Sequence, residues 1–308
     1  MSVLRDVLYQ YDGTFDGFLC CIHDSYLYKE IPVGFSSDGD FLSLYEVRIV
    51  PTQAAHSQRV YRGLAARSNK AAKAVYRGFL TCMEDKELRL YAFVRKVFRE
   101  GDRFMRNLSD PVFYPLHKAL RHMSGELEKL RGFVRFSDYN GVLGAVIEPE
   151  NQVLPMLRRH FCDRYSNEAF FIFDRTHREI LLYARGISRI QPLERLDLAA
   201  PDAEEVQYRR LWKAFFETVT IRERENPRCQ NTFLPKRYRG VMTEFLPLDG
   251  GVVPAEPSWP QLRPRRRSRQ QYERCRQELD IDRACRTTAS SRGTGKNQRA
   301  RRNDGSAL

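Results

Sequence analysis

The first hundred residues combine the two-residue hydrophobic period of strands with the three-to-four-residue period of helices. Val3–Tyr11 and Phe41–Val50 alternate loosely between apolar and polar side chains, which predicts two strands. Thr14 is placed to cap a helix that runs to about Tyr28. Its apolar stripe consists of Phe15, Phe18, Leu19, Ile22 and Tyr26. Further helices are expected at residues 51–66, from Ser68 to about 83, and at about 90–101.

The pattern after residue 130 is richer in short β-type runs. Arg131–Phe136 and Gly141–Ile147 read as the two strands of a hairpin. A helix to about Tyr165 and strands at Ala169–Asp174 and Glu179–Tyr183 follow. Asp202 and Glu205 resemble a capping box at the start of a long helix. The bulky apolar face expected on that helix is made of Leu211, Trp212, Phe215, Phe216 and Val219.

These elements predict an α+β fold followed by a tail. We expect a helix-rich part with some strands at residues 1–130 and a mixed part of short strands and helices at 131–249. The pattern is compatible with one shared core and with two separate ones. Residues 250–308 contain few large apolar side chains and many arginines, so they cannot bury enough surface to offset the entropy of ordering the chain. The sequence therefore predicts a disordered Arg-rich tail.

Charge points to an anionic partner. The formal net charge is +13, and the tail alone has fourteen Lys and Arg against six Asp and Glu. A basic protein attracts polyanions such as DNA whatever its fold. No apolar run approaches the length of a membrane span, and the first ten residues lack the pattern of a secretory leader. We therefore expect a cytoplasmic protein with no membrane partner.

The motifs of several enzyme classes are missing. The seven cysteines are irregularly spaced and contain no C-x-x-C pair, which argues against a metal site. His177-Arg178-Glu179 supplies half of a zinc-deaminase signature, but the P-C-x-x-C half is absent. Neither a P-loop nor a G-x-G-x-x-G pattern occurs. We expect no bound metal and no cofactor.

Three stretches carry a resemblance to a known family. They are YDGTFDGFLCCIHDSY at Tyr11–Tyr26, then LRGFVRF with LRRHFCDR and FFIFDRTHR between residues 130 and 178, and LWKAFFETVTIRERENPRCQNTFLPKRYRG at Leu211–Gly240. Together they resemble a bacterial family linked to DNA metabolism and DNA repair. Its domain of unknown function is sometimes fused to a uracil-DNA-glycosylase-like domain and is typically encoded beside a radical SAM protein. The first stretch departs from the family pattern at Cys20-Cys21 and His23-Asp24. The resemblance implies a DNA context and a radical SAM partner, but it brings no catalytic residues.

One group of residues is a candidate for catalysis. His160 and Arg164 are four residues apart on one helix, so they share a face. Asp174 ends a strand, where sites are often built. The full group comprises His160, Arg164, Asp174, His177, Arg178 and Glu179. It could form an acid/base pair or a phosphate clamp, or simply a buried Arg–Asp pair that fixes a helix to the sheet.

A second group is a candidate for binding. Basic side chains alternate with aromatic and proline residues between 221 and 239, which suits phosphate contact and base stacking. The candidates are Arg222, Arg224, Arg228, Lys236, Arg237, Tyr238 and Arg239. We expect Lys236 and Arg237 to serve binding rather than stability. The other interpretation is a solvated helix end followed by a loop that packs against the core, with Glu223 and Glu225 paired to neighbouring arginines. The basic run Arg263–Arg269 reads either as a nucleic-acid arm or as a terminus without a role.

The leading interpretation is a DNA-associated accessory or repair protein that binds nucleic acid and acts with a radical SAM partner. One alternative is an enzyme that acts directly on a DNA base or phosphodiester through the His160/Asp174 region. Another is a protein scaffold that makes no DNA contact.

Overall fold

The computed structural model describes residues 6–37, 45–198, 201–221 and 226–246. The fold is α+β, as the sequence predicts. Its contacts divide the chain into two compact units, whose described parts come from Met1–Phe79 with Asp85–Leu116 and from Leu80–Glu84 with His117–Pro264. The division falls inside one long helix, and the boundary expected near residue 130 lies further along that helix. The expected tail at 250–308 lies outside the described residues.

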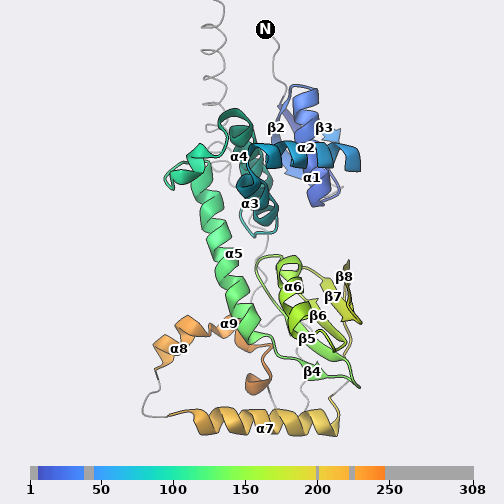
Figure 1. The fold of residues 1–308 in the computed structure, drawn as a ribbon, viewed down its shortest axis with the longest axis vertical. Helices are drawn as coiled ribbons and strands as arrows, with labels where there is room; N and C mark the ends of the chain where they lie inside the picture. The colour runs from blue at the N-terminus through green and yellow to red at the C-terminus, as the bar shows by residue number, and fades with distance from the viewer. Residues whose placement is uncertain (1–5, 38–44, 199–200, 222–225, 247–308) are drawn as a thin grey trace, which may run out of the picture. The chain divides into compact units, whose positions relative to one another are not determined.

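The first unit contains a three-stranded parallel sheet. β1 (Asp6–Gln10) lies between β2 (Ile31–Ser36) and β3 (Glu46–Ile49), and β2 and β3 are labelled in Figure 1. The three central residues of β1 are all buried, which fits its middle position. α1 (Phe15–Leu27) makes the crossover from β1 to β2. The other helices of this unit are α2 (Ala54–Arg67), α3 (Asn69–Phe79), α4 (Lys86–Glu100) and a 3₁₀ turn at Arg103–Arg106.

The predicted start of α1 is confirmed. The Thr14 hydroxyl accepts a hydrogen bond from the Gly17 backbone N–H at 2.9 Å, which caps the helix. Phe18, Leu19 and Ile22 of the predicted stripe are buried. Phe18 stacks on Phe79 of α3 with ring centroids 5.7 Å apart. The local capping signal and the apolar stripe therefore agree with the packing.

A five-stranded sheet is the centre of the second unit. Its order is β4 (Ser137–Asp138), β5 (Leu143–Ile147), β6 (Phe170–Asp174), β7 (Glu179–Ala184) and β8 (Ile187–Pro192). Only β5 and β6 pair in parallel, because α6 (Leu154–Arg164) forms the crossover between them. α6 lies against the sheet (Figure 1). The remaining elements are α5 (Phe113–Phe133), α7 (Ala203–Val219), α8 (Pro227–Phe233), α9 (Lys236–Arg239) and a 3₁₀ turn at Thr243–Phe245.

The strand predicted at Arg131–Phe136 is wrong. Its first three residues form the last turn of α5, and only Ser137–Asp138 pairs with β5. Helical spacing of buried Met123, Leu127 and Leu130 explains the difference, since this stripe carries the helix through Phe133. The sequence analysis therefore missed α5 and also the short strands β2 and β8.

α7 is held by its polar start and by part of its apolar face. Asp202 caps the helix by accepting from the Glu205 N–H at 2.8 Å. The Glu205 side chain accepts from the backbone N–H of Asp138 and pairs with Arg209. The predicted apolar face is largely exposed, with Leu211 at 59% and Phe215 at 56%. Its contacts include Phe216, which packs edge-on against Phe245 with ring centroids 5.9 Å apart, and Trp212, whose ring lies under Arg135.

Two helical glycines give a matched test of the packing. A Cβ at Gly78 would lie 2.6 Å from Leu116 Cδ1 and 2.8 Å from Leu90 Cδ2, whereas a Cβ at Gly125 meets nothing within 4 Å. Gly78→Ala should lower the free energy of unfolding by about 1 kcal/mol or more, because overpacking outweighs the gain in helix propensity. Gly125→Ala should raise it by up to about 1 kcal/mol. Urea unfolding measures both, and equal effects would contradict the close approach of α3 to Leu90 and Leu116.

Candidate functional site

A buried carboxylate organises the loop that follows β5. The Glu126 side chain, on α5, is only 1% exposed. It accepts hydrogen bonds from the backbone N–H groups of Glu150 at 3.0 Å and Asn151 at 2.9 Å. The Asn151 amide donates to it as well, at 2.7 Å. Three N–H donors satisfy a buried charge that would otherwise be strongly destabilising. Glu126 therefore fixes residues 150–151 at the carboxyl end of a parallel strand, where α/β proteins often bind ligands.

Four further residues contact Glu126, Asn151 or each other around these two side chains. Asn151 Oδ1 accepts from the Cys82 N–H at 3.0 Å. His122 Nε2 lies 3.2 Å from Glu150 Oε2. Arg237 pairs with both Glu126 and Glu150. Together, Cys82, His122, Glu126, Glu150, Asn151 and Arg237 form a polar cluster, which we call the Glu126 cluster.

Hydrogen bonding determines the tautomer of His122. Both ends of the Asn151 amide are fixed, since its oxygen accepts from Cys82 and its nitrogen donates to Glu126. The same nitrogen lies 3.3 Å from His122 Nδ1, so Nδ1 must accept and Nε2 must carry the proton. Nε2 then donates to Glu150. A solvent-exposed imidazole with a carboxylate beside it is suited to proton transfer.

The cysteine of this cluster is not prepared for nucleophilic attack. Burial raises the pKa of the Cys82 thiol, and the negative charges of Glu150 and Glu126 raise it further. The reactive form of cysteine is the thiolate, which a raised pKa disfavours at neutral pH. Acid/base chemistry by His122 and Glu150 fits this cluster better than catalysis by the thiol.

The structure divides the predicted catalytic residues between separate places. Asp174 is fully buried at the end of β6 and accepts from the His177 ring at 2.7 Å and from the N–H groups of Thr176 and His177. Burial raises the pKa of Asp174. Arg178 instead pairs with exposed Glu194. Glu179, the remaining member of this group, accepts from Gln152.

His160 and Arg164 lie on α6, and in the described part of the chain no hydrogen bond or ion pair joins either to Asp174. The His160 ring packs edge-on against Phe161, and its buried Nε2 has no hydrogen-bond partner among the described residues. Arg164 lies over the Tyr165 ring. The sequence correctly places His160 and Arg164 on one helix, but the structure does not connect them with the strand-end group.

The predicted binding segment is also divided. Arg222 and Arg224 lie outside the described residues, while Arg228 and Lys236 are exposed. Tyr238 is buried against Phe133 of α5. Arg239 donates to Asn231 and to the Leu234 carbonyl. Arg237 belongs to the Glu126 cluster. Arg237, Tyr238 and Arg239 therefore contact other residues of the second unit rather than forming an open surface.

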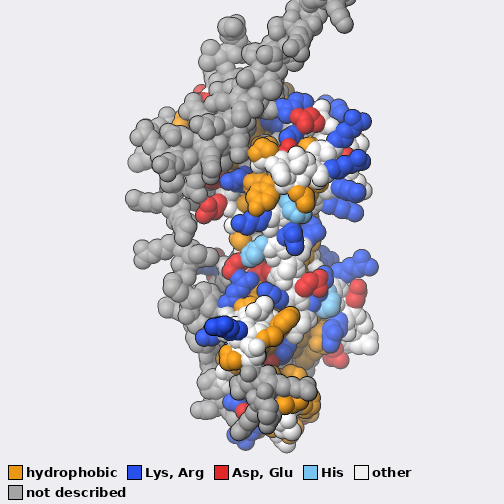
Figure 2. Space-filling view, turned by 90° about the vertical axis from the view of Figure 1, so that its left-hand side faces the viewer, with side chains coloured by type: hydrophobic (Ala, Val, Ile, Leu, Met, Phe, Trp, Pro, Cys, Tyr) orange, Lys and Arg blue, Asp and Glu red, His pale blue; other side chains and the backbone are white. Residues whose placement is uncertain are grey.

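The first unit has a basic surface that the sequence analysis missed. Between Val47 and Met83 the chain has seven Lys and Arg and no Asp or Glu. α2 and α3, separated only by Ser68, present Arg59, Arg62, Arg67, Lys70 and Lys73 as exposed side chains. We call these five side chains the basic helical face. Figure 2 shows Lys and Arg gathered along one edge of the first unit. The absence of acidic residues between Val47 and Met83 is the sequence signal for this surface. The net charge of +13 does not reveal it, because most of the excess lies in the tail.

Two neighbouring cations should have different roles. Arg237→Ala should lower the free energy of unfolding by about 1–3 kcal/mol, because it leaves buried Glu126 without its cation. Lys236→Ala should change it by less than about 0.5 kcal/mol, since its side chain is exposed. Urea unfolding of both variants is the measurement. Equal losses would show that Arg237 does not tie α9 to α5.

His160 should make stability depend on pH. Burial lowers the pKa of His160, and Arg131 and Arg164 lower it further. Its contribution to stability is therefore fully present above the unfolded-state pKa of about 6.5 and is lost as pH falls through the lower folded-state pKa. The loss of stability between pH 7.5 and 5.5 should be smaller in His160→Gln than in the unsubstituted protein. Urea unfolding at both pH values tests this, and parallel losses would contradict it.

Comparison with known proteins identifies a family for this chain. No curated protein matches the chain significantly. A family model described as a domain of unknown function, DUF4130, matches residues 84–244, which is just over half of the 308 residues. The matched span includes the whole Glu126 cluster except Cys82, and it ends at Glu244, which pairs with Arg135. The protein therefore belongs to the DUF4130 family of domains of unknown function.

Proposed function

We propose that this protein binds DNA, largely without regard to sequence, as an accessory or repair protein of the cytoplasm. The observation that carries the proposal is the basic helical face. The five exposed cations of this face lie between residues 47 and 83, a stretch that contains no Asp or Glu, and they create a local positive potential. Arg48 lies in the same stretch but is paired with Glu30, so it does not contribute to the face. Phosphate groups are the ligands that such a surface attracts most strongly.

The state of the individual side chains supports a binding role. None of the five cations of the basic helical face has an ion-pair partner among the described residues; Arg62 has only a 3.5 Å contact with the Gln58 amide. By contrast, Arg135, Arg175 and Arg209 of the second unit each pair with a carboxylate that is less than 10% exposed. The arginines that are paired with enclosed carboxylates maintain the fold. The cations of the basic helical face remain available to an external anion.

The partner protein is proposed from the resemblance alone. A radical SAM protein encoded beside this family would supply the chemistry, and this chain would hold DNA. Among the described residues, no helix has the length and apolar character to cross a bilayer. The alternative of direct catalysis through His160 and Asp174 has less support, because the two side chains belong to different networks. A scaffold without DNA contact would leave the basic helical face without a role.

Two double variants with equal loss of charge test the proposal. Arg62→Gln with Lys73→Gln removes two cations of the basic helical face, and Arg189→Gln with Arg210→Gln removes two exposed cations of the second unit. The first variant should bind duplex DNA more weakly, and its slope of log K against log salt should become shallower by up to about 1.8, or about 0.9 per phosphate contact. The measurement is fluorescence anisotropy with the full-length chain.

The control variant, Arg189→Gln with Arg210→Gln, should bind duplex DNA with the affinity of the unsubstituted protein. It should also retain most of the slope of log K against log salt. Circular dichroism would confirm that both variants fold. Equal weakening in the two variants would indicate a general charge effect rather than a surface on α2 and α3. Failure of the unsubstituted protein to bind any oligonucleotide at low salt would contradict the proposed function itself.

A further inference from the structure

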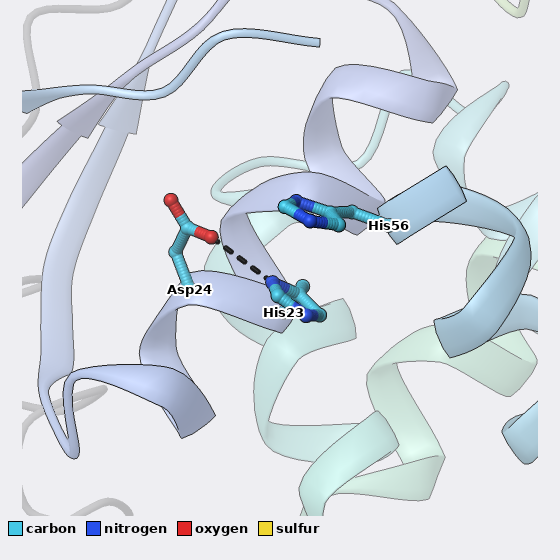
Figure 3. A group of neighbouring side chains, drawn as sticks. All are labelled: His23, Asp24 and His56. Atoms are coloured by element: carbon cyan, nitrogen blue, oxygen red, sulfur yellow. Dashed lines mark hydrogen bonds and ion pairs between the residues drawn. The ribbon is translucent and has the colours of Figure 1, made fainter. Parts of the chain in front are cut away.

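Two histidines and an aspartate meet where α1 packs against α2. His23 and Asp24 are near the end of α1, and His56 is in the first turn of α2. The two imidazole rings are stacked with centroids 4.0 Å apart, while the Asp24 carboxylate approaches His23 from the side (Figure 3). One potential ligand atom from each residue lies within 4.8 Å of the other two. All three residues are half-buried.

The spacing of His23 and Asp24 suits two ligands of one ion. Asp24 Oδ1 lies 3.1 Å from His23 Nδ1. Two ligand atoms that each bind a tetrahedral ion at about 2 Å are separated by roughly 3.3 Å, which is close to this distance. An ion bound between the two atoms takes the place of the proton that they share, and a neutral His23 then carries its proton on Nε2.

In the described part of the chain, most enclosed carboxylates are paired with a Lys or Arg side chain, and Asp24 is not. Its side chain is 14% exposed, and its only ion-pair partner among the described residues is His23. Elsewhere Glu30 is paired with Arg48 and Asp110 with Lys96. A neutral imidazole leaves the charge of Asp24 uncompensated, and a divalent cation would provide the missing charge.

We propose that His23, Asp24 and His56 bind one divalent transition-metal ion of the Zn²⁺ type. Two imidazoles and one carboxylate are ligands that zinc and its first-row neighbours favour, at bond lengths of roughly 2.0–2.2 Å. Stacked rings cannot both direct a lone pair at one ion, so one imidazole rotates out of the stack on binding. Three protein ligands leave a position open for water, as in catalytic rather than structural zinc sites.

The chain offers one competing set of ligands in its described part. Cys82, His122 and Glu150 are also close together, but Glu150 is already paired with Arg237. Both nitrogens of His122 are engaged, Nδ1 by Asn151 and Nε2 by Glu150. Binding there would require breaking the bonds that hold the Glu126 cluster together. The site at His23 requires only the rotation of a half-buried ring.

This inference differs from the expectation of no metal site. That expectation came from ligand spacing along the chain, whereas His23 and His56 are brought together by the packing of two helices. The site lies outside residues 84–244, which match the family model. It does not depend on DNA binding.

Metal titration of the full-length, tag-free protein tests the proposal. After removal of bound metal by a chelator, Zn²⁺ is added in competition with a chromogenic indicator, and Co²⁺ is added separately to record its visible absorption bands. One equivalent should bind, and Zn²⁺ should raise the midpoint of thermal unfolding. His56→Gln should weaken binding by at least about tenfold, which is the minimum expected for losing even an outer partner of a metal site. It should also abolish the rise in the unfolding midpoint.

A matched variant distinguishes the two ligand sets. His122→Gln with Cys82→Ser should bind Zn²⁺ as tightly as the unsubstituted chain. Asp24→Asn provides a second, milder disruption of the proposed site, should His56→Gln unfold. The proposal is overturned if the unsubstituted protein binds no Zn²⁺, if binding is lost only with His122 and Cys82, or if it survives both His56→Gln and Asp24→Asn.

Discussion

The pairing of buried carboxylates with arginines is the interaction on which the second unit depends. Glu126, Glu205 and Glu244 are each almost wholly enclosed, and each meets an arginine. The Arg237 and Arg135 pairs connect residues more than a hundred positions apart. A buried charge without its partner is strongly destabilising, so each pair specifies where two distant segments must meet. α9 and the 3₁₀ turn after it are held in place in this way.

Pairing with a carboxylate also distinguishes the cations that stabilise the fold from those that can bind an external anion. Among the described residues, the acidic side chains of the first unit lie in β1, α1, β3, α4 and the turns around these elements, and the stretch that contains α2 and α3 has none. The five cations of the basic helical face therefore have no carboxylate close to them in the sequence. Hydrophobic packing of Val60, Leu64, Ala71 and Val75 holds these helices, so their charged faces are not needed for folding. The exposed side chains of the basic helical face are therefore available for binding.

Local signals could be read from the sequence, and contacts between distant segments could not. The starts of α1 and α7 follow from Thr14 and Asp202, because a capping residue acts within its own turn. α5 was missed where the β-type residues Phe133, Val134 and Phe136 obscured the helical spacing of its buried residues. For the candidate site, the sequence identified Arg237 and Tyr238 as special but assigned them to a surface. Only the fold shows that Arg237 meets Glu126, and that His23 stacks on His56.

The central claim is that DNA contacts the basic helical face, and lysine footprinting of the unsubstituted protein tests it most directly. The full-length chain is acetylated under limiting conditions with and without duplex DNA, and the modified lysines are identified by mass spectrometry. Lys70 and Lys73 should be protected by DNA, while exposed Lys236 of the second unit should react equally in both samples. Protection of Lys236 with unchanged reactivity at Lys70 and Lys73 would contradict the claim and return the binding surface to the segment around α9.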